Sequence, residues 1–508
     1  MEKKVIKKPS DSRLERVLGF LALDVLALVC FGFGGSNGLN FLRVIGISVA
    51  LFLYPYFRYH VMDFRSKKGP IPAFIALFLL GFSYYWVTYY SSAILYGILF
   101  NLITSLGFIG FFILGGAFRQ INELKREYIA LAILGSLALL VLISGVYSLF
   151  RYGPFYVARF SGLVYYFDGV VFPIASEGKL LDGFMFREAS LAVCKLPAFI
   201  LACSGVGLFA MKPEKSNWRF FTLLAFAGLG VIDLLLVPFL SGLVFLVLVY
   251  LVMGMHRLIQ IKLPGEANEA KRNKIAKVLF FILLGLAGLI TFIFLLDTAL
   301  GEANSFLRKI PLLFKDGEPR QFGTLIVGIE DAIGAAFFST RGGVRSFNFL
   351  TFLFGANAVD ASGTRLSVYN TQFFEFTIFY QNGFLGFAGL LFLIFFGIYH
   401  GHRFLEKGEG LPCQRMAFVG MLLGIFLFLS FNNDEIPLKH AYGIDEFFSY
   451  HSSLLVPISR SSTFLLASFL LGFVYTPDVK REEETQEEKK EAPAPAINEE
   501  QKEAFQHE

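Results

Sequence analysis

Long apolar blocks constrain this chain more than any other feature. Uncharged runs of about 18 residues or more recur along its 508 residues, and that length lets a helix cross roughly 30 Å of hydrocarbon. Only 17% of the residues are charged and 55% are hydrophobic, whereas a soluble chain of this size would fold as several more highly charged domains. The sequence therefore predicts an all-α polytopic membrane protein.

About twelve membrane-spanning helices are expected from these blocks. The uncharged run around Pro238 is too long for one helix, so we divide it into a hairpin at Pro238 and Gly242. No small-residue cleavage site follows the basic N-terminus, so we interpret the first span as an anchor. The predicted spans are 17–33, 40–56, 71–89, 92–115, 128–149, 191–210, 220–236, 240–255, 278–298, 377–399, 416–431 and 462–476.

The orientation follows from lysine and arginine, which concentrate in cytoplasmic loops. If the basic segment 1–16 lies inside, most of the 45 basic residues are cytoplasmic. Both termini are then cytoplasmic, and the bundle 17–476 has three outer segments, about 150–190, 299–376 and 432–461. The tail 477–508 is rich in charge, alanine and proline, which is typical of disordered chain.

The largest outer segment, 299–376, shows helix-like apolar periodicity in two places. These are Asn304–Leu313 and Phe322–Phe338, separated by Asp316-Gly317-Glu318-Pro319. The pattern predicts amphipathic helices on the outer surface. They would either cap the bundle or guide a substrate into it.

The outer segments offer no pattern for a metal or a cofactor. Only His440 and His451 face outward, without a cysteine or carboxylate cluster to match them. Neither a phosphate-binding glycine loop nor a Ser-His-Asp signature is present in the sequence, and the four cysteines show no paired spacing. We therefore expect no cofactor, no metal and, since the basic residues form no single face, no nucleic-acid partner.

Arginines are scattered over the outer segments, and their planar donor groups suit phosphate and diphosphate. Arg341 and Arg345 are four residues apart and would share a face on a helix, while Arg159 and Arg187 belong to the first outer segment. The alternative for the Arg341 and Arg345 pair is an ordinary surface location.

Two outer carboxylates, Glu188 and Glu375, each lie at the mouth of a span, where burial would raise the pKa and favour a general base. Either could instead be a helix-terminal charge or the partner of an arginine. Asp24, Lys195 and Asp233 lie within spans, and charged groups there are costly and therefore functional candidates. Lys195 and Asp233 could equally be structural partners.

Five motifs occur in order between about 150 and 400. Together they resemble the O-antigen polymerase and O-antigen ligase superfamily of bacterial polysaccharide assembly enzymes. The motifs are Arg159-Phe160-Ser161-Gly162, Phe184–Ala192, Leu240-Ser241-Gly242 in a short outer turn, Arg341 to Gly355, and Tyr369-Asn370 to Gly386.

This resemblance implies a GT-C-like fold and a metal-independent glycosyltransferase at the outer face of a bacterial inner membrane. Its substrate would be a polyprenyl-diphosphate-linked oligosaccharide, and its partners would be membrane lipids and a chain-length regulator. Glu188 would be the base, and Glu375 or Tyr369 would be the next candidate for that role. Arg345 would stabilise the leaving diphosphate. The diphosphate-binding residues implied are Arg159, Arg187, Arg341, Arg345 and Asn370.

Three functions remain open at this point. Ligases carry a histidine where this chain has Tyr369, and an arginine in the turn where it has Leu240-Ser241-Gly242. Both departures favour a polymerase of O-antigen, capsule or exopolysaccharide over a ligase acting on a lipid A-core or protein acceptor. A twelve-span transporter or flippase is the third alternative, although its usual long central inner loop is missing from the predicted topology.

Overall fold

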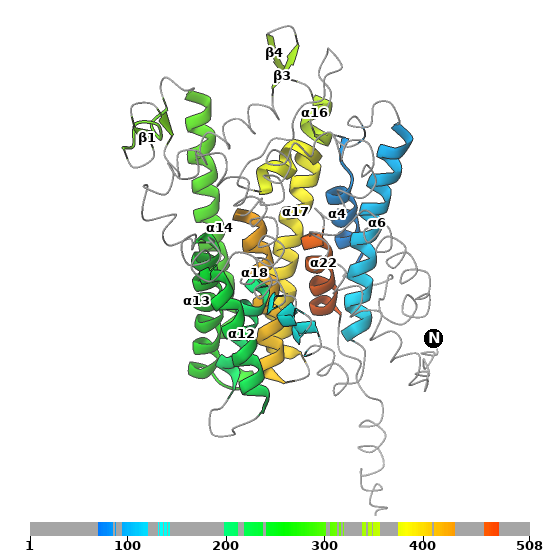
Figure 1. The fold of residues 1–508 in the computed structure, drawn as a ribbon. Helices are drawn as coiled ribbons and strands as arrows, with labels where there is room; N and C mark the ends of the chain where they lie inside the picture. The colour runs from blue at the N-terminus through cyan, green and yellow to red at the C-terminus, as the bar shows by residue number, and fades with distance from the viewer. Residues whose placement is uncertain are drawn as a thin grey trace, which may run out of the picture. The chain divides into compact units, whose positions relative to one another are not determined.

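The computed structural model is mainly helical in the parts of the chain that it describes (Figure 1). These parts are residues 70–84, 87, 94–119, most of 131–142, 198–211, 218–236, 240–300, much of 305–319 and 338–355, 374–408, 411–431 and 462–476.

Nine α-helices and two short 3₁₀ helices have defined bounds among the described residues. The α-helices are α4 (Ile71–Gly81), α6 (Ile94–Arg119), α12 (Trp218–Leu236), α13 (Leu240–Lys262), α14 (Glu269–Leu300), α16 (Phe349–Phe354), α17 (Phe374–Lys407), α18 (Pro412–Phe431) and α22 (Ser462–Tyr475). The 3₁₀ helices are η3 (Gly205–Ala210) and η4 (Glu266–Asn268).

Two antiparallel hairpins lie between α14 and α17. The first pairs β1 (Phe314–Lys315) with β2 (Glu318–Pro319), and the second pairs β3 (Phe338–Arg341) with β4 (Val344–Phe347).

The predicted division of the run around Pro238 into two helices is confirmed, because α12 ends at Leu236 and α13 begins at Leu240. Residues 237–239 lie outside the described residues, and Gly242, expected in the hairpin turn, lies inside α13. The predicted span 71–89 is wrong as one continuous helix: α4 ends at Gly81, and Phe82 has an extended backbone. Two helical segments in the described chain, Phe245–Lys262 and Gln381–Lys407, are long and apolar enough to cross a membrane by length and composition.

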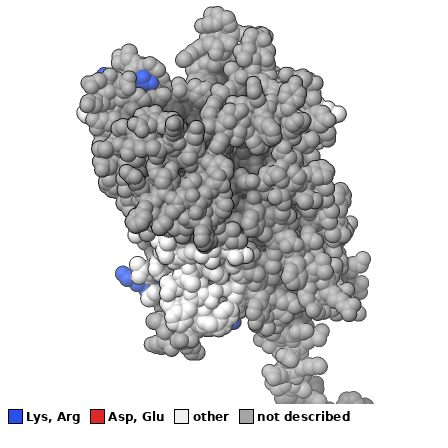
Figure 2. All heavy atoms as spheres, in the orientation of Figure 1, with Lys and Arg blue, Asp and Glu red and all other residues white. Residues whose placement is uncertain are grey.

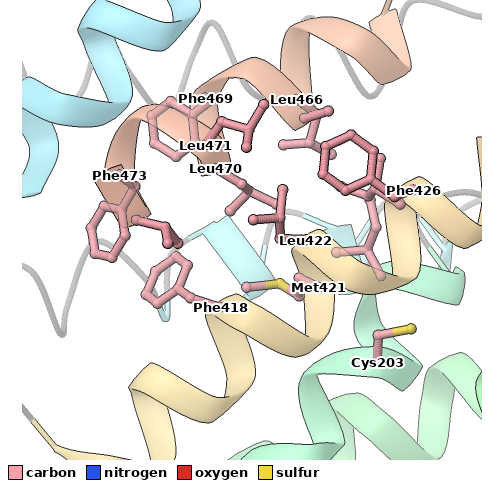
Figure 3. Packing of buried hydrophobic residues seen from close by; sticks show 14 of the residues in the cluster. Cys203, Phe418, Met421, Leu422, Phe426, Leu466, Phe469, Leu470, Leu471 and Phe473 are labelled. Carbon is pink, nitrogen blue, oxygen red and sulfur yellow. The ribbon is translucent and has the colours of Figure 1, made fainter. Parts of the chain in front are cut away.

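Close helix packing builds the core. α6 and α22 cross where Gly115 faces the backbone of Phe469 and Gly472 faces the backbone of Phe112, so that neither site has room for a Cβ atom. Next to this crossing, apolar side chains of α18 and α22 interdigitate (Figure 3). The rings of Phe418 and Phe473 stack there with centroids 4.3 Å apart.

The outward sides of α13 and α14 are apolar. Side chains that are more than half exposed include Val247, Leu251 and Leu258 on α13 and Phe281, Leu289 and Phe292 on α14. In Figure 2 the described part of the visible surface is largely uncharged, with Lys or Arg at only a few points. Large contiguous apolar exteriors of this kind are covered by lipid or by another protein in functioning molecules.

The helix predicted at Asn304–Leu313 is wrong for its described part, because residues 305–311 form turns. The Asp297 carboxylate, near the end of α14, accepts hydrogen bonds from Ser305 Oγ (2.6 Å) and from the Phe306 and Leu307 N–H groups (2.7 and 3.2 Å). A carboxylate that takes successive backbone donors favours a tight turn over a helix. The second predicted helix, Phe322–Phe338, lies outside the described residues except for Phe338, which begins β3.

Candidate functional site

The backbone inside α17 departs from helical geometry at Gly383. This residue has φ 68° and ψ −168°, a combination that is essentially restricted to glycine. A Cβ atom at Gly383 would overlap the backbone of Leu353, so glycine is required for both its conformation and its size. The helix is thus interrupted within the Gln381-Asn382-Gly383 motif.

The Asn382 side chain joins this break to the end of α4. It is 5% exposed, and its Nδ2 group donates to the carbonyl oxygens of Leu80 (2.8 Å) and Phe82 (2.9 Å). Leu80 lies in the last turn of α4 and Phe82 is the residue that caps it, where a helix leaves its acceptors without partners. Gly386 allows this arrangement, because a Cβ atom there would overlap that of Asn382.

Further polar groups complete the contact between the two interrupted helices. Ser83 Oγ donates to the carbonyl of Gln381 at the α17 break, and Asn101 Nδ2 donates to the carbonyl of Ser83 at 2.8 Å. Ser83 and Asn101 are almost completely buried. Side-chain donors therefore replace the backbone bonds that both helices lose at their breaks.

The short helix α16 packs on the same break. Gly355, which follows α16, has φ 101° and donates its N–H to the carbonyl of Thr351 (2.9 Å), so it caps the helix in the left-handed conformation. A Cβ atom on Gly355 would overlap the backbone of Gln381. The rings of Phe352 and Phe384 stack across this contact with centroids 5.4 Å apart.

The β3–β4 hairpin directly precedes α16 and contains both Arg341 and Arg345. In its register Arg345 is opposite Thr340, and Arg341 is opposite Val344. Opposite residues share a face and successive residues alternate, so the two arginines occupy positions on opposite faces of the hairpin. The shared helical face considered from their spacing does not apply, because this segment forms strands.

Glu375 is the second residue of α17, at the helix end nearer the Gly383 break. Leu240-Ser241-Gly242, expected in a turn, forms the start of α13. The other predicted site residues, Arg159, Arg187, Glu188, Tyr369 and Asn370, lie outside the described residues, as do Asp24 and Lys195. Asp233 is buried in α12, and its Oδ2 atom has no hydrogen-bond partner within the described chain.

A second polar group, which the sequence analysis did not identify, lies at the Lys407 end of α17. Glu406 Oε2 accepts hydrogen bonds from Arg272 Nε (2.9 Å) and Nη2 (2.6 Å), and Arg272 Nη1 donates to the carbonyls of Leu263 and Gly265. Both charged side chains are largely buried. This charge-assisted pair fixes the start of α14 against the end of α17.

Two histidines and an exposed ion pair extend this second group. His402 Nε2 lies 2.8 Å from Asn273 Oδ1, and the rings of His256 and His402 meet edge to face. Lys407 Nζ binds Glu269 Oε1 at 2.8 Å, and this hydrogen bond holds the pKa of Glu269 below its ordinary value. The spacing of His402 and Glu406, four apart on a helix, is the sequence signal for this group, and the prediction from the outer histidines alone does not include it.

No family model matches the chain, and neither a curated protein nor a solved structure was found to match it.

Proposed function

We propose that the protein is a polysaccharide polymerase with about twelve spans and a GT-C-like fold. It lengthens a glycan carried on polyprenyl diphosphate at the outer face of a bacterial inner membrane. The ordered motifs of the sequence are the basis of this proposal. The apolar exteriors of α13 and α14 are consistent with a lipid surrounding.

The observation that best supports the proposal is the place of the arginine hairpin in the chain, directly before the contact of α16 with α17, a helix long and apolar enough to cross a membrane. Arg345 precedes Gly355 by ten residues, and Gly355 packs directly on the backbone of Gln381. β4 ends at Phe347 and α16 begins at Phe349, so a single residue joins the hairpin to the helix that packs on the α17 break. This short connection limits how far Arg345 can lie from the α17 break, and restricted position is what orientation of a diphosphate requires.

The reaction requires the protein to deprotonate the acceptor hydroxyl and to stabilise the leaving diphosphate. The bond between the anomeric carbon of the growing glycan and the diphosphate oxygen breaks, and that carbon bonds to a hydroxyl oxygen of the acceptor repeat unit. The acceptor proton passes to a base. Glu188 is the first candidate for this base, and Glu375 and Tyr369 are the next candidates. Arg345, with Arg159, Arg187 and Asn370, stabilises the charge that develops on the leaving diphosphate. Arg341 occupies the opposite face of the hairpin and is not assigned to the same diphosphate.

The test is reconstitution of the full chain in liposomes with a polyprenyl-diphosphate-linked repeat unit. The wild type is expected to lengthen the glycan without nucleotide or ion gradient, and Arg345→Ala to lower that rate at least about 100-fold through lost charge stabilisation. Lys315→Ala, in the neighbouring β1–β2 hairpin, is the control and should keep wild-type activity. Normal lengthening by a correctly inserted Arg345→Ala protein would contradict the proposal.

Transport is the second candidate, because α4 and α17 are both interrupted where they meet, and interrupted helices line substrate sites in many transporters. The same liposomes separate the two functions. Movement of the lipid-linked unit across the bilayer without lengthening would favour a flippase. Transfer to a lipid A-core or protein acceptor without polymer would favour a ligase.

A further inference from the structure

We propose that His256, His402 and Glu406 bind one divalent transition-metal ion of the zinc class at the Lys407 end of α17. One ring nitrogen of each histidine and one carboxylate oxygen of Glu406 all lie within 4.8 Å of one another. The proposal does not depend on the polymerase function, since none of these residues belongs to the predicted glycan site.

The fold brings the three ligands together from two helices. His402 and Glu406 are four residues apart on α17 and so lie on the same face of that helix. His256 is contributed by α13, and Arg272 of α14 contacts the same carboxylate. A metal ion here would join α13 to α17 and, through Arg272, to α14.

Glu406 is already oriented as a ligand. Arg272 holds Oε2 with two hydrogen bonds, whereas Oε1 lies 3.7 Å from His256 Nε2 and 3.4 Å from Gln260 Nε2. Ligand atoms at the usual zinc distances of about 2.0–2.1 Å are roughly 3.4 Å apart in a tetrahedron. The observed separation of Oε1 and Nε2 therefore needs only a small closure. Partners that fix the other oxygen of a ligating carboxylate are common around metal sites.

Each histidine can also offer a ring nitrogen with a free lone pair to a metal. A proton on His402 Nε2 would be donated to Asn273 Oδ1, which leaves the other ring nitrogen with a lone pair for a metal. The Nδ1 atom of His256 is buried and has no hydrogen-bond partner in the described part of the chain. Since no hydrogen bond fixes a proton on Nδ1, the proton can reside there and leave Nε2, which faces Glu406, with the lone pair that a metal needs.

The ligand set selects the class of ion. Two imidazoles and one carboxylate suit Zn²⁺ and its neighbours, whereas Mg²⁺ and Ca²⁺ prefer oxygen ligands alone. Three protein ligands leave a fourth position, which water would occupy. The rival interpretation is a clasp of hydrogen bonds and charges that holds the helices together without metal.

Zinc stoichiometry of the purified full-length protein separates the two interpretations. The affinity tag is removed, the protein is stripped with chelator and equilibrated with Zn²⁺, and bound zinc is counted by mass spectrometry. The wild type should hold one more equivalent than the His256→Gln/His402→Gln variant. His400→Gln is the matched control and should retain that equivalent, because His400 lies on the same helix but packs between Phe396 and Tyr475.

A second variant keeps the proposal testable if the double variant does not fold. His256→Cys keeps a metal ligand at this position, and with Co²⁺ it should show a thiolate-to-cobalt charge-transfer band that the wild type lacks. Equal zinc in the wild type and a folded double variant would overturn the proposal. So would His256→Cys protein that binds no Co²⁺ through its thiolate, as the metal-free clasp predicts.

Discussion

The two ends of α17 are held by different chemistry. At the Gly383 end, uncharged donors of Asn382 and Ser83 satisfy backbone carbonyls, and the side chains are buried. At the Lys407 end, ion pairs of Glu406 with Arg272 and of Lys407 with Glu269 connect α17 to α14.

This difference follows from which polar groups lack partners at each end of α17. A break inside a helix frees backbone carbonyls, and neutral amide and hydroxyl donors satisfy them without burying a charge. At the Lys407 end the charged groups are paired: Arg272 and Glu406 are largely buried, whereas the Lys407 and Glu269 pair reaches water and is open to screening by ions. We therefore expect the Gly383 end to depend on shape and hydrogen bonding and the Lys407 end to depend on salt.

Gly383→Ala should have the largest effect on stability. The alanine must adopt a backbone conformation that costs about 1–3 kcal/mol, and its methyl group overlaps the Leu353 backbone, so we expect loss of folded protein. The yield of monodisperse protein in detergent measures this. Gly285→Ala adds the same methyl in α14, where nothing lies within 4 Å, and should be neutral or slightly stabilising. Equal yields would show that α17 is not broken at Gly383.

Asn382→Leu should have the second largest effect. It keeps the approximate volume but leaves the carbonyls of Leu80 and Phe82 without donors, which costs roughly 2–4 kcal/mol. Thermal unfolding should report this loss at both low and high salt, because no charge is involved. Thr222→Val is the control, since the Thr222 hydroxyl donates to the Trp218 carbonyl of its own helix and joins no other described element. A loss that disappears at high salt would contradict this view of the Gly383 end.

Part of this fold could be predicted from the sequence. The α12–α13 break follows from Pro238, and the apolar blocks locate α14, α17 and α18 because each is long and continuous. The end of α4 at Gly81 could not be predicted, since the apolar run continues beyond it. It depends on donors from Asn382, about 300 residues away in the sequence.

The candidate site, too, could be predicted only in part from the sequence. The sequence identified the Gln381–Gly386 motif and the arginines before it, because unusual residue types stand out in an apolar chain. It did not predict the strand register that places Arg341 and Arg345 on opposite faces. It also missed the group around Glu406, whose members come from α13, α14 and α17 and are brought together only by packing.

Lys407→Gln should have the smallest effect of the three and should be the one that depends on salt. The side chains of Lys407 and Glu269 are 59% and 30% exposed, and exposed pairs contribute little because water and ions screen them. The Lys407 hydrogen bond lowers the pKa of Glu269, so the contribution of the pair is present above the ordinary glutamate pKa. It is lost as the pH falls through the lowered value. Thermal unfolding of wild type and variant should therefore differ slightly at low salt and neutral pH, and should coincide at high salt or after acidification. A salt-independent loss as large as that of Asn382→Leu would mean that the two ends of α17 are not held by different forces.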